Sequence, residues 1–116
     1  MRCVLITGAN SGLGYYAAQN IAAAGHRVLL ACRSVAKAEE AASKIAQSLD
    51  MATDTIVPVN CPLDLANFES VRKFAQKVET PDVLVNNAAV FHQGQLTDSE
   101  YFRINAWSPV LLTDLL

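Results

Sequence analysis

The sequence predicts an α/β fold in which a parallel sheet is covered by helices on both faces. Short apolar runs alternate with helical stretches of roughly ten to fifteen residues, which is typical of βαβ units. The first run is apolar throughout, as in a strand buried on both faces, and a glycine-rich turn follows it. With right-handed crossovers, four such strands predict the order 3-2-1-4. This is the first part of a doubly wound, Rossmann-type sheet.

Each apolar run is predicted to form one strand of the sheet. The runs are rich in valine, leucine and isoleucine and are bounded by turn residues. The predicted strands are 3–7, 27–32, 55–60 and 82–86. In the predicted order the strand at 82–86 is an edge with unpaired backbone groups, and such an edge invites pairing with another chain.

The segments between the runs are predicted to be helical, with apolar side chains at helical spacing. Gly25 suits the C-cap of the first helix, and Asn67 suits the N-cap of the third. Pro109 removes a backbone donor from the last helix, where a kink is expected. The predicted helices are 13–24, 35–49, 67–78 and 98–116, with a turn at 8–11 and a loop at 88–95.

Composition and charge narrow the class of protein. The 116 residues suit one domain, and the 52% hydrophobic and 17% charged residues indicate a packed core. A net charge of -2 without a run of basic residues gives no electrostatic case for nucleic acid or an anionic membrane surface. The N-terminal apolar run is too short for a membrane span or a signal peptide.

The cysteines follow neither a disulfide framework nor a metal-ligand spacing. Their number is odd, and Cys3 and Cys32 lie in apolar runs of the sequence, with Cys61 as the third. We expect buried, reduced thiols and no metal site. A reducing intracellular compartment such as the cytoplasm follows from this.

The turn after the first strand has the spacing of a dinucleotide-binding loop. Gly8 permits the tight turn, Gly12 lets the backbone approach a pyrophosphate, and Gly14 allows the helix to pack closely on the strand. The helix N-terminus offers N–H groups and a positive dipole end, and Ser11 can add a hydroxyl donor. An ordinary glycine-rich turn is the alternative, but the position after the first strand favours phosphate binding. The predicted contacts are Gly8, Asn10, Ser11, Gly12, Leu13 and Gly14.

The end of the second strand favours NADP(H) over NAD(H). An NAD site places a carboxylate about 20 residues past the glycines, on the ribose 2′-hydroxyl. Arg33 and Ser34 stand there instead, and a guanidinium fork suits a 2′-phosphate. Arg33 can also be read as a solvated turn residue. We expect the intact site to prefer NADP(H), with NAD(H) the weaker ligand.

Four motifs in order resemble those of the short-chain dehydrogenase/reductase family, and the resemblance covers the whole chain. The glycine motif is Thr-Gly-x-x-x-Gly-x-Gly rather than Gly-x-Gly-x-x-Gly. The other three are Asp64-Leu65, Asn86-Asn87-Ala88-Ala89 and Asn105, of which the second departs from the family's Asn-Asn-Ala-Gly at Ala89. The tail 110–116 is similar to the same helix in retinol-dehydrogenase-like members, and protochlorophyllide-reductase-like members look similar in this half.

The resemblance implies roles for these residues. Asp64, with Leu65, would hold the adenine, although Asp64 could simply cap the next helix. Asn86, Asn87 and Ala88 would lie beside the cofactor, where an asparagine either contacts the nicotinamide-side ribose or braces neighbouring backbone. Asn105 would be the family's catalytic Asn, supporting a water-linked proton relay, or else a polar helix residue without such a role.

The family's remaining catalytic groups, a Ser and a Tyr-x-x-x-Lys pair, are not found in this sequence. Tyr15, Tyr16 and Tyr101 each lack a lysine four residues later. We therefore expect one dinucleotide-binding domain over residues 1–116, incomplete at the C-terminus and inactive alone. A fragment, a truncated isoform and a shortened gene model are the explanations considered.

The expected function of the full protein is NADP(H)-dependent interconversion of a carbonyl and an alcohol on a hydrophobic small molecule, with C=C reduction left open. A homo-oligomer is compatible with the exposed edge strand. The alternative is a non-catalytic module that binds a dinucleotide or pairs with another protein.

Overall fold

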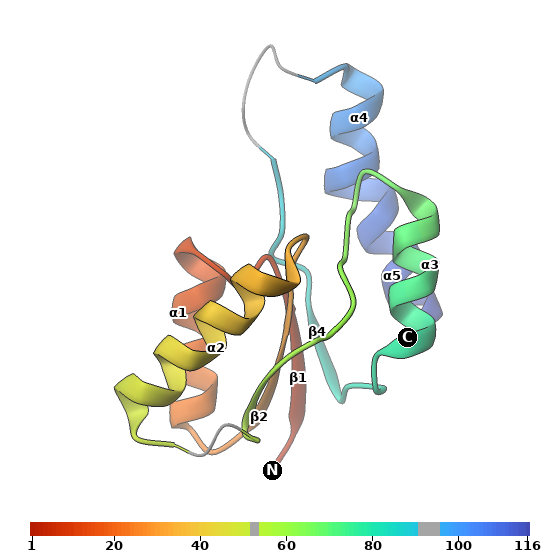
Figure 1. Cartoon of the computed structure of the whole chain (residues 1–116). Helices are drawn as coiled ribbons and strands as arrows, with labels where there is room; N and C mark the ends of the chain where they lie inside the picture. The colour runs from red at the N-terminus through yellow and green to blue at the C-terminus, as the bar shows by residue number, and fades with distance from the viewer. Residues whose placement is uncertain (52–53, 91–95) are drawn as a thin grey trace.

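The computed structural model describes residues 1–51, 54–90 and 96–116. In these residues four parallel strands form one sheet in the order β3-β2-β1-β4, so the predicted order 3-2-1-4 is confirmed (Figure 1). The strands are β1 (Cys3–Thr7), β2 (Arg27–Ala31), β3 (Ile56–Pro58) and β4 (Val83–Val85). Strand β1 is central. It pairs with β4 from Val4, which lies opposite Val83, to Ile6, which lies opposite Val85.

Three strands are shorter than the apolar runs that predicted them. The runs 27–32, 55–60 and 82–86 become Arg27–Ala31, Ile56–Pro58 and Val83–Val85. Pro58 is the last residue of β3, although the Val59 N–H still donates to the Leu30 carbonyl at 3.0 Å. Beyond the strands some pairing continues, since the Leu63 N–H donates to the Cys32 carbonyl at 2.9 Å. The runs therefore extended past the residues that pair as strands.

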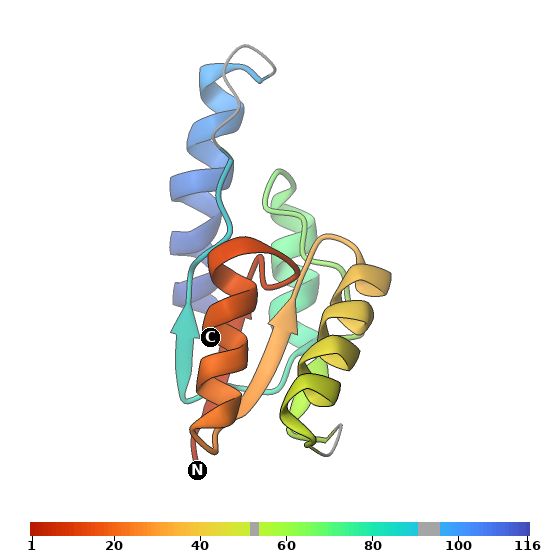
Figure 2. The same cartoon turned by 90° about the vertical axis from the view of Figure 1, so that its left-hand side faces the viewer.

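The two faces of the sheet are covered by different helices. Helices α1 (Gly12–Ala23) and α2 (Val35–Leu49) cover one face, and α3 (Phe68–Lys77) and α5 (Ser108–Leu115) cover the other (Figure 1). Figure 2 looks onto the α1–α2 face. Alternate strand residues serve the two cores, so Leu5 packs with α3 and α5 while its neighbour Ile6 packs under α1 and α2.

The last predicted helix, 98–116, has three parts. They are α4 (Asp98–Phe102), a π-helical turn η1 (Arg103–Trp107) and α5. A capping box between Thr97 and Glu100 starts α4. The Ser108 N–H donates to the Arg103 carbonyl five residues earlier, which is the π pattern. Because Pro109 cannot donate to the residue four before it, the expected disturbance takes the form of this wide turn.

Cys32 and Cys61 are buried free thiols, and Cys3 is partly buried. None of the helices in the described ranges is both long and apolar enough to cross a membrane. In the same ranges no group of three acidic, histidine or cysteine side chains gathers as metal ligands would. The predicted loop 88–95 falls in part on residues 91–95, which lie outside the described residues.

Candidate nucleotide-binding site

A cavity of about 480 Å³ opens at the carboxyl ends of the strands. In open parallel sheets this is where ligands bind, because loops from several strands meet there. The described lining residues lie at or after the ends of the four strands, just before α4, and in η1. They are Thr7, Gly8, Asn10, Ala31, Cys32, Arg33, Leu63, Asp64, Leu65, Ala66, Ala88, Ala89, Val90, Leu96 and Ile104.

The glycine turn at the end of β1 is shaped by close contacts at two of its three glycines. A Cβ at Gly8, where φ is +64°, would lie 2.9 Å from the Cα of Ala88. A Cβ at Gly14 would lie 2.4 Å from Asn87 Nδ2 and 2.5 Å from the Gly8 carbonyl oxygen. Gly12 also has a positive φ, +59°, but a Cβ at Gly12 would meet no atom within 4 Å. That open direction leaves the backbone free for a ligand to approach.

The N-terminus of α1 provides the donors of this turn. Ser11 is the N-cap residue, and its side chain makes no capping hydrogen bond. The first turn carries no acidic residue. N–H groups at a helix N-terminus, with the positive end of the dipole, favour an anion such as a pyrophosphate. Asn10 lines the cavity, whereas Leu13 projects outward with 83% of its surface exposed.

Asn87 and Thr7 hold the glycine turn and the end of β4 together by hydrogen bonds. Asn87 Nδ2 donates to the carbonyls of Thr7 and Gly8, both at 3.2 Å. Thr7 is 1% exposed, and its Oγ1 accepts the N–H groups of Asn87 at 3.1 Å and Ala88 at 3.0 Å. The amide of Asn87 therefore braces the backbone, which was one of its two predicted roles. Thr7 was missing from the predicted contacts, although a hydroxyl residue closing a buried apolar strand is a signal for such a brace.

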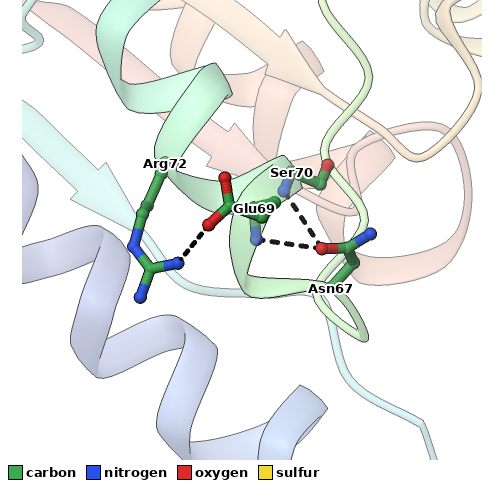
Figure 3. A network of polar contacts seen from close by, with 4 residues as sticks. All are labelled: Asn67, Glu69, Ser70 and Arg72. Atoms are coloured by element: carbon green, nitrogen blue, oxygen red, sulfur yellow. Dashed lines mark hydrogen bonds and ion pairs between the residues drawn. The ribbon is translucent and has the colours of Figure 1, made fainter.

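The segment after β3 forms the side of the cavity where adenine was predicted. Asp64 Oδ1 accepts the Ala66 N–H at 3.0 Å, and no described residue hydrogen-bonds to Oδ2. Asn67 Oδ1 accepts the N–H groups of Glu69 at 2.9 Å and Ser70 at 3.4 Å, so Asn67 caps α3 (Figure 3). Asp64 is thus released from capping, and it is the one acidic side chain among the described lining residues.

Arg33 and Ser34 follow β2 at the same cavity edge. Arg33 is exposed, lines the cavity and makes no ion pair with a described residue. Ser34 is the N-cap of α2, where its Oγ accepts the Lys37 N–H at 3.3 Å. A hydroxyl that accepts one hydrogen bond keeps its proton to donate. The position predicted for a 2′-phosphate therefore has a free guanidinium and a hydroxyl donor.

Several predicted residues do not line this cavity, namely Ser11, Gly12, Leu13, Gly14, Ser34, Asn86, Asn87 and Asn105. Two of them contact other parts of the chain. Asn86 lies on the other side of its strand end, where Nδ2 donates to Thr113 Oγ1 at 3.1 Å, and both line a separate hollow against α5. Asn105 binds the backbone of Val90 twice, since Oδ1 accepts the Val90 N–H and Nδ2 donates to the Val90 carbonyl, each at 2.9 Å. Asn105 thus reaches the cavity only through Val90, and its predicted catalytic role stays a prediction.

The comparison with protein families agrees with this geometry. The model for short chain dehydrogenases matches residues 2–116. The chain belongs to the short-chain dehydrogenase family. Among the residues of the family's motifs, Thr7, Gly8, Asp64 and Ala88 line one cavity, while Asn86 and Asn105 contact other backbone and side-chain groups.

Relatives of this short-chain dehydrogenase are much longer than the 116 residues. Retinol dehydrogenase 14 of Mus musculus is 43% identical, and the match covers 99% of this chain but 39% of that protein. Retinol dehydrogenase 13 of Mus musculus is 40% identical, with 99% and 36% covered. Among solved structures, L-sorbose reductase of Gluconobacter frateurii, complexed with NADPH and L-sorbose, is 26% identical with a TM-score of 0.79, and 99% of this chain matches 46% of that one.

The residues of this short-chain dehydrogenase fit a dinucleotide. Gly12 leaves open space beside the N-terminus of α1, and the hydroxyl of Ser11 makes no capping bond there. The cavity at the carboxyl ends of the strands carries the guanidinium of Arg33, which has no described ion-pair partner, and a carboxylate oxygen of Asp64 without a described partner. These groups match, in order, a pyrophosphate, a 2′-phosphate and an adenine amino group.

Cys32 lines the cavity although its role was predicted only as a buried thiol. Burial raises the pKa of the Cys32 thiol, and the N–H groups of Ala9 and Asn10, which face the sulfur, lower it by less. The thiol is therefore protonated at neutral pH, and a protonated thiol is a poor nucleophile. Its place directly before Arg33 was the signal that it lies beside the site.

Proposed function

We propose that this chain is the NADP(H)-binding part of an oxidoreductase that interconverts a carbonyl and an alcohol on a hydrophobic small molecule. The observation that carries the proposal is a cavity at the carboxyl ends of the strands, lined by Gly8 and Asn10 of the glycine turn and by Arg33, which has no ion-pair partner among the described residues. When bound, the nicotinamide cofactor supplies or accepts a hydride. The similarity to retinol dehydrogenases supports a hydrophobic substrate, and C=C reduction is the second reaction considered.

Each part of the chain has a stated task in this proposal. The N–H groups at the start of α1 hold the pyrophosphate, and the missing Cβ of Gly12 permits its approach. Arg33 donates to the 2′-phosphate, and Asp64 accepts from the adenine amino group. Asn105 fixes the backbone of Val90, which closes the cavity on the β4 side.

The first test is whether the isolated chain binds NADPH without turning it over. Because no described tyrosine has a lysine four residues later, we expect binding but no aldehyde-dependent oxidation of NADPH by the 116-residue chain. Binding is measured by the fluorescence of NADPH, and oxidation by its absorbance. A folded chain that binds no NADPH would overturn the proposal. Turnover by this chain would overturn the view that it is a non-catalytic part.

The second test is a change of cofactor preference at Arg33. In Arg33→Asp the 2′-phosphate loses its charge-assisted donors, and the new carboxylate suits the 2′-hydroxyl of NADH. Such hydrogen bonds contribute about 1.5–3 kcal/mol, so we expect the ratio of NADPH to NADH affinity to fall about 10- to 100-fold. Titration of both cofactors measures it, and an unchanged ratio would show that Arg33 is only a solvated turn residue.

A matched control for this test is Arg72→Asp on α3. Arg72 carries the same charge and pairs with Glu69, and it does not line the cavity. The same charge change placed there should leave the ratio of the two affinities as in the wild type. A shift in both variants would mean that net charge, and not the position of Arg33, sets the preference.

A further inference from the structure

Three side chains of η1 and α5 hydrogen-bond to backbone groups that line the cavity on two sides. Ser108 Oγ donates to the Leu65 carbonyl at 2.6 Å, and Arg103 Nη1 donates to the Ala66 carbonyl at 3.3 Å. On the opposite wall, Asn105 binds both backbone groups of Val90. Leu65, Ala66 and Val90 all line the cavity, whereas none of the three helix residues does. The helix therefore acts on the cavity through backbone carbonyls and amides.

Ser108 is unusual in its burial. In the described part of the chain, the polar side chains classed as buried are Thr7 at 1% and Ser108 at 0% exposed. Thr7 is explained by the brace under the glycine turn. The hydroxyl of Ser108 reaches a carbonyl 43 residues earlier in the sequence, close to the apolar cluster of Phe74 and Leu112. A buried hydroxyl placed against one carbonyl restricts where that carbonyl can lie.

The π turn explains why two neighbouring carbonyls are held from one helix. In an α-helix, residues five apart point about 140° away from each other. In η1 the Ser108 N–H bonds to the Arg103 carbonyl, and this wider turn brings residues five apart to the same side. Arg103 is steadied further by its guanidinium, which lies 5.4 Å from the ring centroid of Phe68. Both donors can therefore face the same segment after β3.

The two carbonyls that Ser108 and Arg103 bind belong to Leu65 and Ala66, which directly follow Asp64. Asp64 Oδ1 is occupied by the Ala66 N–H at 3.0 Å, so a shift of residues 65–66 shifts the carboxylate with it. We propose that Ser108 is a positioning residue that sets the adenosine side of the cavity, by holding the Leu65 carbonyl so that the second oxygen of Asp64 faces the base. The inference rests on the proposed function, because it assigns a role within the same nucleotide site.

The test measures binding of adenosine 2′,5′-bisphosphate and of NADPH to the 116-residue chain by calorimetry. Ser108→Ala removes one hydrogen bond to a backbone carbonyl, so both dissociation constants should rise by about three- to tenfold and by the same factor. Ser108→Thr keeps the hydroxyl but adds a methyl group at a buried position, so it should lose stability and still bind both ligands more tightly than Ser108→Ala does. If the wild type binds neither ligand, the proposed function fails. If the wild type binds and Ser108→Ala binds equally well, only the positioning role fails.

A destabilised control separates positioning from general loss of stability. Ile45 is fully buried in the core on the α1–α2 face, so Ile45→Val lowers the thermal stability without touching residues 64–66. It should leave both dissociation constants unchanged, and an equal weakening would overturn the proposal. Should Ser108→Ala not fold, Arg103→Met applies the same test at the Ala66 carbonyl. Unchanged affinity in that variant would also overturn it.

Discussion

Gly14→Ala should lower the free energy of unfolding by about 2 kcal/mol and weaken NADPH binding with it. The new Cβ would lie 2.5 Å from the Gly8 carbonyl oxygen and 2.4 Å from Asn87 Nδ2. Neither atom can retreat alone, because Asn87 Nδ2 is bonded to the carbonyls of Thr7 and Gly8. Overpacking of this kind costs about 3 kcal/mol, and the better helix propensity of alanine returns about 1 kcal/mol. Urea unfolding followed by circular dichroism measures the difference.

Gly12→Ala is the matched control for this prediction. Its Cβ meets no atom within 4 Å, so only the backbone at φ +59° resists the change. That strain costs about 1–2 kcal/mol. The methyl group would stand where the pyrophosphate approaches, so NADPH binding should fall further than the stability loss explains. A Gly14→Ala variant as stable as the wild type would show that α1 does not pack on β1 as closely as the structure has it.

Thr7→Val should destabilise the chain by about 2 kcal/mol although it keeps the shape of the side chain. The lost hydroxyl accepts the N–H groups of Asn87 and Ala88. Asn87 keeps a second acceptor, the Val85 carbonyl at 3.0 Å, whereas no other described group accepts from the Ala88 N–H. Ala88 is partly buried, and a donor left there without a protein acceptor loses a hydrogen bond and pays part of its desolvation penalty. Denaturant unfolding measures the change, and NADPH affinity should fall because Ala88 lines the cavity.

Thr7→Ser is the control that keeps the hydroxyl. It removes one methyl group from a buried position, which costs about 1 kcal/mol, and leaves both hydrogen bonds in place. NADPH affinity should therefore stay close to that of the wild type. If Thr7→Val and Thr7→Ser lose the same stability and affinity, the hydroxyl contributes nothing and the brace under the turn is wrongly assigned.

The edges of the predicted elements show what local patterns can specify. Apolar runs located each strand and helix, but the strand within the run at 55–60 spans only Ile56–Pro58, because its length also depends on the partner strand, where only Val28–Leu30 pair with it. The helix predicted over 98–116 was located correctly, yet its central π turn was not predicted. A helix can accommodate the missing N–H of Pro109 either by a kink or by a π turn before the proline. Which of the two forms depends on how α5 packs on α3.

The sequence by itself determined the strand order, the family and the glycine turn. Hydrophobic periodicity and the spacing of Gly8, Gly12 and Gly14 depend on residues close together in the chain, so they can be read without tertiary contacts. The structure alone decided which polar side chains brace the site and which face it. Asn87 meets Thr7 across 80 positions, and Ser108 meets Leu65 across 43. Such partners are set by the packing of helices on a sheet, which no local pattern encodes.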